Sequence, residues 1–89
     1  MMRTRFYFSA VHHDLDNVVA VLAGIFGGAT LYQGRGIWNG QVEPAYVLEV
    51  LGETDHTCTE GTARWLAETF GQSEVWYTME PVEVYQVKR

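Results

Sequence analysis

Residues 27–51, GGATLYQGRGIWNGQVEPAYVLEVL, contain the signals that decide the fold. Asn39-Gly40 lies between two short apolar stretches and is a strong signal for a two-residue hairpin turn. Thr30–Gln33 reads as a short strand that the following glycines break or bulge, whereas Ala45–Leu51 reads as a continuous strand. The hairpin delivers one carboxylate, Glu43, to the start of this otherwise apolar strand, where folding needs no charge.

Strand and helix patterns precede this hairpin. Alternation of apolar and polar residues over Arg5–Val11 predicts a first strand. Apolar residues then recur at helical spacing from Leu15 to Phe26. They predict a helix with Asp14 as its N-cap and Gly27-Gly28 at its end.

A second helix and one or two further strands follow the hairpin. Thr57-Cys58-Thr59-Glu60 has the spacing of a capping box and predicts the start of a second helix, which Gly71 ends. Glu74–Met79 reads as a strand, and Val82–Val87 can add a final edge strand. We therefore expect residues 1–89 to form one α+β domain. It would be a split β-α-β, ferredoxin-like sandwich with two helices on one face of a mostly antiparallel, four- to five-stranded sheet.

The other face of such a sheet would be left bare. Tyr7, Tyr46, Trp76 and Tyr77 are more aromatic side chains than we expect a sheet to leave in water. Association of copies through that face would cover them, and cyclic closure as a dimer or trimer is the simplest solution.

Charge and composition exclude several classes of function. Six Lys and Arg against 11 Asp and Glu give a net charge of −5, so nucleic acid is not an expected partner. A cationic ligand is favoured instead. No segment is long and apolar enough to span a bilayer, and the single cysteine, Cys58, fits a reducing cytoplasm.

Five side chains are candidates for a site. Glu43 could be a solvated charge or an anionic group placed for a cation at a subunit boundary. Gln72 follows a helix-ending glycine, and its amide can donate and accept hydrogen bonds at once. Trp38 on the hairpin could pack or cover a purine. Glu49 would need a partner if its face is interior, and Ser9 is a polar group near the end of the first strand.

Other chemistries have weak signatures. His12-His13-Asp14 invites a metal interpretation, but adjacent side chains of an extended chain point to opposite sides, so we expect no metal site. Gly27-Gly28 follows a helix and no Gly-Lys-Ser/Thr is present, which argues against a phosphate loop. A Ser/His/Asp nucleophile has no local signature either.

The residues also carry a resemblance to a known family. Phe8-Ser9-Ala10, Gly36-Ile37-Trp38, Glu43, Leu66-Ala67 and Gln72 resemble the corresponding positions of the phage S-adenosylmethionine lyases, long called S-adenosylmethionine hydrolases. The resemblance covers nearly the whole chain. The same skeleton is similar to that of an uncharacterised bacterial domain family.

The resemblance implies a PII-like domain that forms a homotrimer, with substrate sites between subunits in the cytoplasm of the phage's host. It implies a catalytic glutamate at Glu43 and a glutamine of the site at Gln72, with no cofactor and no metal. Where the family has a tyrosine this chain has Trp38, so Tyr46 or Tyr32 would have to supply any hydroxyl.

The implied reaction is cleavage of S-adenosylmethionine to methylthioadenosine and homoserine lactone by the substrate's own carboxylate. A related branch acts on an adenylated derivative, SAM-AMP, which serves as a CRISPR signal. Two alternatives stay open: a non-catalytic sponge that sequesters a nucleotide signal or S-adenosylmethionine, and an oligomeric scaffold with no ligand.

Overall fold

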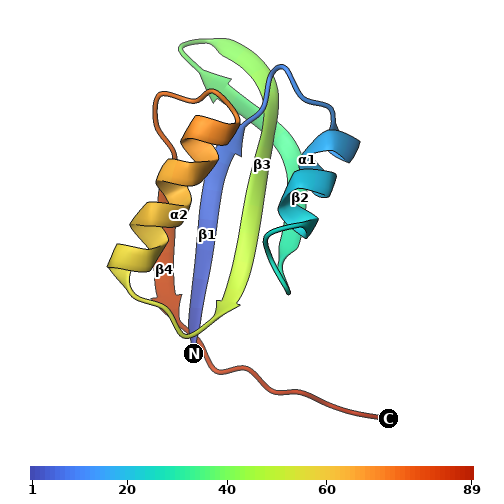
Figure 1. The fold of residues 1–89 in the computed structure, drawn as a ribbon, viewed down its shortest axis with the longest axis vertical. Coiled ribbons are helices and arrows are strands. Elements are labelled where there is room, and N and C mark those ends of the chain that lie inside the picture. The colour runs from blue at the N-terminus through green and yellow to red at the C-terminus, as the bar shows by residue number, and fades with distance from the viewer.

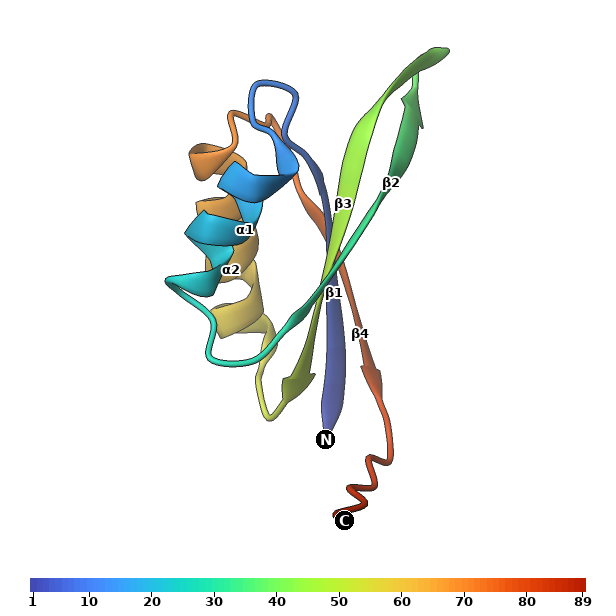
Figure 2. The same cartoon turned by 90° about the vertical axis from the view of Figure 1, so that its right-hand side faces the viewer.

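The computed structural model describes all residues, 1–89, as two helices packed on one face of a four-stranded sheet (Figure 1). The elements in chain order are β1 (Met2–Ser9), α1 (Leu15–Ala23), β2 (Thr30–Trp38), β3 (Gln41–Gly52), α2 (His56–Thr69) and β4 (Trp76–Pro81). The strand order is β2-β3-β1-β4, and every neighbouring pair is antiparallel. Figure 2 shows both helices on the same side of the sheet. The predicted α+β architecture is confirmed, and it is compatible with a ferredoxin-like sandwich.

The core between the helices and the sheet follows from alternation on the central strands. Phe6 and Phe8 of β1 face the helices and are buried. Directly opposite residues of an antiparallel pair share a face, so their β3 partners, Leu48 and Tyr46, enter the same core. Leu66 of α2 packs onto this layer. Each large side chain buried here contributes roughly 1.5–3 kcal/mol of hydrophobic stabilisation.

Both helices begin at an aspartate N-cap. The Asp14 carboxylate accepts from the backbone N–H of Asn17 at 2.8 Å, as predicted for α1. The expected capping box of Thr57-Cys58-Thr59-Glu60 is wrong, because α2 begins earlier, at His56. Its N-cap is Asp55, whose extended backbone lets the carboxylate accept from the N–H of Cys58 at 2.9 Å.

The first helix is shorter than its pattern suggests. It ends at Ala23, with Gly24 as C-cap, before the predicted stop at Gly27-Gly28. Phe26 still packs against the core, but it does so from the connecting loop, where its N–H bonds the carbonyl of Leu22 at 2.9 Å. The helical spacing of apolar residues therefore continues for about one turn beyond the end of α1.

The hairpin turn is confirmed, whereas the predicted break in its first strand is wrong. Asn39 and Gly40 both have positive φ, 51° and 77°, as a two-residue type I′ turn requires. Gly34 and Gly36 do not interrupt β2, because each pairs in register with a residue of β3 and neither needs a positive φ. The hairpin strands are consequently nine and 12 residues long.

The ends of the chain also differ from expectation. β1 begins at Met2 and stops at Ser9 instead of spanning 5–11, and β4 is shifted to Trp76–Pro81. The predicted edge strand over 82–87 does not form. The N–H of Val82 donates to the carbonyl of Met1 at 2.9 Å, and residues 83–89 make no further backbone hydrogen bond with the sheet. The tail, residues 82–89, therefore leaves the sheet, as Figure 1 shows.

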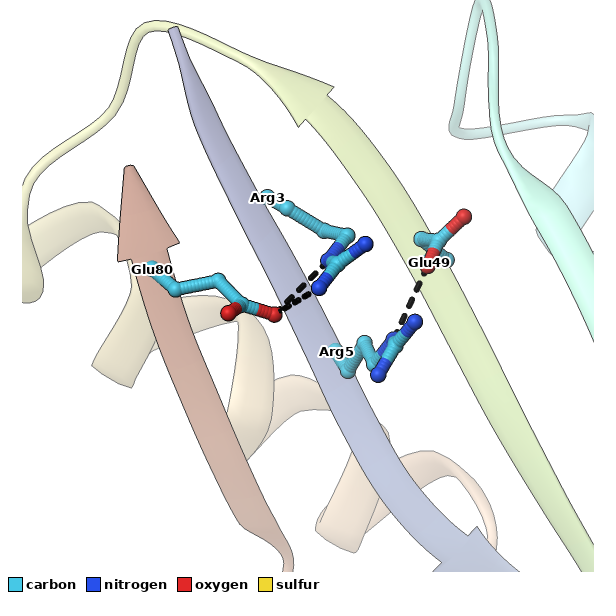
Figure 3. A network of polar contacts seen from close by, with 4 residues as sticks. All are labelled: Arg3, Arg5, Glu49 and Glu80. Carbon is cyan, nitrogen blue, oxygen red and sulfur yellow. Dashed lines mark hydrogen bonds and ion pairs between the residues drawn. The ribbon is translucent and has the colours of Figure 1, made fainter. Parts of the chain in front are cut away.

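Two of the aromatic residues expected on the bare face lie elsewhere. Tyr46 and Tyr77 pair with Phe8 and Phe6 and so face the helices, whereas Trp76 is on the open face. We use "open face" for the side of the sheet away from the helices. Cross-strand ion pairs occupy one end of it, between Arg3 and Glu80 and between Arg5 and Glu49 (Figure 3).

Candidate functional site

A cleft of about 440 Å³ lies at the end of the open face where β1 stops and the β2-β3 hairpin extends beyond it. Four predicted site residues line it: Ser9, Trp38, Glu43 and Gln72. They come from the end of β1, the end of β2, the start of β3 and the loop after α2. The fold thus brings together side chains that are up to 63 residues apart in the sequence.

Gln72 is fixed by two hydrogen bonds to one residue. Its Oε1 accepts from the backbone N–H of Ser9 at 2.8 Å, and its Nε2 donates to Ser9 Oγ at 2.7 Å. Gly71 has a φ of 67°, the left-handed conformation that turns the chain after a helix. This turn lays Gln72 against the end of β1. The amide keeps one N–H and acceptor capacity for a ligand, since each end has used only part of its hydrogen-bonding capacity.

Glu43 is half-buried in the cleft wall, and its carboxylate makes no hydrogen bond or ion pair within the chain. It lies opposite Gly36 in the β2-β3 register, on the open face. The eleven lining residues include no Lys, Arg or His. The carboxylate therefore has no cationic partner in the cleft, and Arg35, which lines an adjoining hollow with Glu43, forms no ion pair with it.

Seven of the eleven cleft residues were not proposed as site residues from the sequence, and three of these matter for ligand binding: Tyr7, Glu74 and Trp76. Tyr7 and Trp76 are in-register partners on β1 and β4, and both line the cleft. The alternation of β1 already placed Tyr7 opposite the core, so its pairing with Trp76 is the signal that could have found both. Glu74 adds a second carboxylate; its position two residues after Gln72 is the only sequence signal for it.

The other predicted site residues lie outside the cleft. Tyr46 is buried in the core, where its ring stacks on Phe8 with centroids 5.7 Å apart. Tyr32 is exposed on the open face of β2 and does not line the cleft. Glu49 accepts from Arg5 Nε at 2.8 Å, and this hydrogen bond raises the pKa of the guanidinium. The partner that Glu49 was expected to need is therefore Arg5.

No second reactive cluster is present. Asp14 is occupied as the cap of α1, and the ring of His13 packs edge-on against Phe70 with centroids 5.2 Å apart. No three His, Cys, Asp or Glu side chains lie together in a way that could hold a metal ion. Cys58 is exposed, and the negative charge of Asp55 raises the pKa of its thiol, which disfavours the thiolate.

Searches against protein-family models, curated proteins and solved structures each gave no match for this chain. Neither helix is long and apolar enough to cross a membrane. The geometry of the cleft and the chemistry of its side chains therefore carry the functional argument.

Proposed function

We propose that this protein is a lyase that cleaves S-adenosylmethionine to methylthioadenosine and homoserine lactone. One observation carries the proposal: Glu43, Gln72, Ser9 and Trp38, which the resemblance and the residue chemistry single out, line one cleft. The cleft combines an unpaired carboxylate with aromatic walls, a combination that suits a cation joined to a purine.

The chemistry needs no nucleophile from the protein. An oxygen of the substrate's carboxylate attacks its own γ-carbon and closes a five-membered lactone. The bond between that carbon and sulfur breaks, and its electron pair stays on sulfur as the neutral thioether methylthioadenosine. Holding the methionine arm in the attack conformation can supply ~7–11 kcal/mol of the barrier reduction.

In this proposal, Glu43 binds the α-ammonium of the substrate. The ammonium keeps its charge throughout the reaction, whereas the positive charge on sulfur falls as the carbon–sulfur bond breaks. A carboxylate bound to the ammonium would therefore hold the arm bent without stabilising the charge that must disappear. Gln72, fixed against Ser9, would supply a rigid polar contact next to it.

The lining of the cleft favours S-adenosylmethionine over its adenylated derivative. A phosphodiester would bring a negative charge to Glu43 and Glu74, with no basic side chain among the lining residues to offset it. Adenylation should therefore weaken binding unless a second subunit contributes a cation.

We also infer that copies associate, as a homotrimer with the clefts near subunit boundaries. The tail supports this, since Val84, Tyr85 and Val87 are exposed on a segment that makes no backbone hydrogen bond with its own sheet beyond Val82. An alternating segment of this kind can add to the free edge of β2 in a neighbouring copy. Deleting residues 83–89 should lower the mass measured by light scattering from that of a trimer, while an unchanged mass would reject the tail as an assembly element.

The direct test is incubation with S-adenosylmethionine followed by chromatography. The lyase predicts methylthioadenosine and homoserine lactone in equal amounts. Hydrolysis to homoserine, or recovery of intact ligand from a tight complex, would reject it, and the second result would identify a cytoplasmic sponge instead. A flat thermal-shift response to both S-adenosylmethionine and a nucleotide panel would leave only a scaffold.

A further inference from the structure

The indole of Trp38 is seated over a position that has no side chain. Trp38 and Gly36 are two residues apart on β2, so both positions point to the open face. A Cβ at Gly36 would lie 2.5 Å from Nε1 and 2.8 Å from Cε2 of Trp38. Gly34, two residues earlier on the same face, has no atom within 4 Å of its Cβ position. The indole thus lies against the strand at Gly36 because that residue is glycine.

This seat brings the indole into the wall that contains Glu43. Gly36 and Glu43 are directly opposite residues of the β2-β3 pair, and Trp38 and Glu43 line the same cleft. Trp38 also lines a second hollow of about 660 Å³, together with Tyr7 and Trp76. The three aromatic residues therefore form a wall shared by both hollows, with the carboxylate at one end.

We propose that the Trp38 indole, seated on Gly36, is the surface on which the cleft recognises a positively charged group, and that it selects an onium ion over the matching neutral thioether. Indole is the aromatic group that attracts cations most strongly. No Lys, Arg or His lines the cleft to compete for its face. The inference rests on the proposed function only for the identity of the onium ligand, a sulfonium.

This assignment gives Trp38 a role in binding that is separate from the chemical step. Its attraction for the sulfonium weakens as sulfur becomes a neutral thioether, so it does not favour the transition state over bound substrate. It does favour substrate over the thioether product. Loss of the indole should therefore raise KM more than it lowers kcat.

Two unreactive ligands test the inference. One is the nitrogen analogue of S-adenosylmethionine, in which a protonated tertiary amine replaces the sulfonium; the other is S-adenosylhomocysteine, the neutral thioether. Titration calorimetry at about pH 6, where the amine is charged, should show wild-type protein binding the onium analogue about three- to thirtyfold more tightly.

The variants isolate the indole and its seat. Trp38→Leu should abolish the preference, and Trp38→Phe should retain part of it. Gly36→Ala should reduce it, because the new methyl group displaces the indole, which is the movable partner of the clash. Gly34→Ala is the matched control on the same strand and face, and should keep the wild-type preference.

Each outcome decides the inference. Absence of a preference in wild-type protein, including failure to bind either ligand, overturns it, and so does an undiminished preference in Trp38→Leu. An equal loss in Gly34→Ala and Gly36→Ala overturns the role of the seat. If Gly36→Ala does not fold by circular dichroism, Trp38→Leu decides. A Trp38-dependent preference without cleavage of S-adenosylmethionine would refute only the lyase, whereas cleavage without that preference would refute only this inference.

Discussion

The two ends of the open face treat their carboxylates in opposite ways. At one end, Glu49 and Glu80 each lie beside an arginine of β1 (Figure 3). At the other end, Glu43 and Glu74 line a cleft with no cationic side chain. Both ends belong to the same sheet, so the sheet backbone does not determine whether a carboxylate is paired with an arginine. The carboxylates of Glu49 and Glu80 are therefore neutralised within the chain, whereas those of Glu43 and Glu74 have no cationic partner in the cleft.

Replacement of Glu43 should have the largest effect. Glu43→Gln keeps the shape of the side chain but removes the charge that would hold the substrate's ammonium. We expect formation of methylthioadenosine to fall about a hundredfold or more. Glu80→Gln is the matched control, since it removes a carboxylate from the paired end of the same face. Equal activity of Glu43→Gln and Glu80→Gln would erase the functional difference between the two ends.

Gln72 tests whether the cleft end is held rigidly. Gln72→Ala removes both hydrogen bonds to Ser9 and leaves the backbone N–H of Ser9 without a partner. We expect a loss of about 1–3 kcal/mol in the free energy of unfolding, measured by denaturant titration. Activity should fall by about tenfold through loosened geometry. Ser9→Ala removes only one of the two bonds and should lie between Gln72→Ala and wild type; an Ser9→Ala effect as large as that of Gln72→Ala would contradict the two-bond account.

Asp55 is a third kind of carboxylate, bound to backbone instead of to an arginine or a ligand. The backbone N–H of Cys58 lowers its pKa below the usual 3.8. Its contribution to stability is therefore fully present above pH 3.8 and is lost as the pH falls through the lower, folded pKa. Asp55→Ala should lower the Tm by a few degrees at about pH 7, and the difference from wild type should shrink at about pH 2. A difference that stays constant between these pH values would exclude a charged cap.

The smallest effect is expected at the paired end. Glu49→Gln weakens the ion pair to Arg5 but touches nothing in the cleft. The pair lies on the sheet surface and is partly exposed, with 36% of the Arg5 side chain and 14% of the Glu49 side chain accessible. Salt can therefore still screen it, so we expect near-wild-type activity and a small, salt-dependent change in Tm. A loss of activity comparable to that of Glu43→Gln would show that Glu49 acts in the site after all.

Much of the fold could be predicted from local patterns. The positive φ values of Asn39 and Gly40 are what an Asn-Gly turn demands, and the N-cap of α1 follows from Asp14. The predicted strand bounds were wrong where pairing between residues distant in the sequence determines whether a strand forms. The glycines of β2 stay in the strand because β3 pairs with them, and the tail stays outside the sheet because no strand pairs with residues 83–89.

Residues of the candidate site could be predicted where a polar side chain stands at the boundary of a helix or strand. Glu43 and Gln72 are polar groups at element boundaries, and the fold brings both to the cleft. Tyr46 was misplaced because its face depends on the register with Phe8, which no local pattern supplies. The packing of the Trp38 indole over Gly36 was also missed, because a contact that depends on the absence of a side chain produces no periodic pattern in the sequence.

The position of β1 in the sheet has a consequence for the order of folding. β1 precedes the other three strands in the chain, yet its neighbours are β3 and β4, so that Met2 pairs with both Gly52 and Pro81. Pairings between residues so distant in sequence require closure of long loops before any contact is gained, which places refolding on a timescale of roughly milliseconds to seconds, measurable by stopped-flow tryptophan fluorescence. During synthesis, the second edge of β1 therefore stays uncovered until β4, the last of the four strands, has been made.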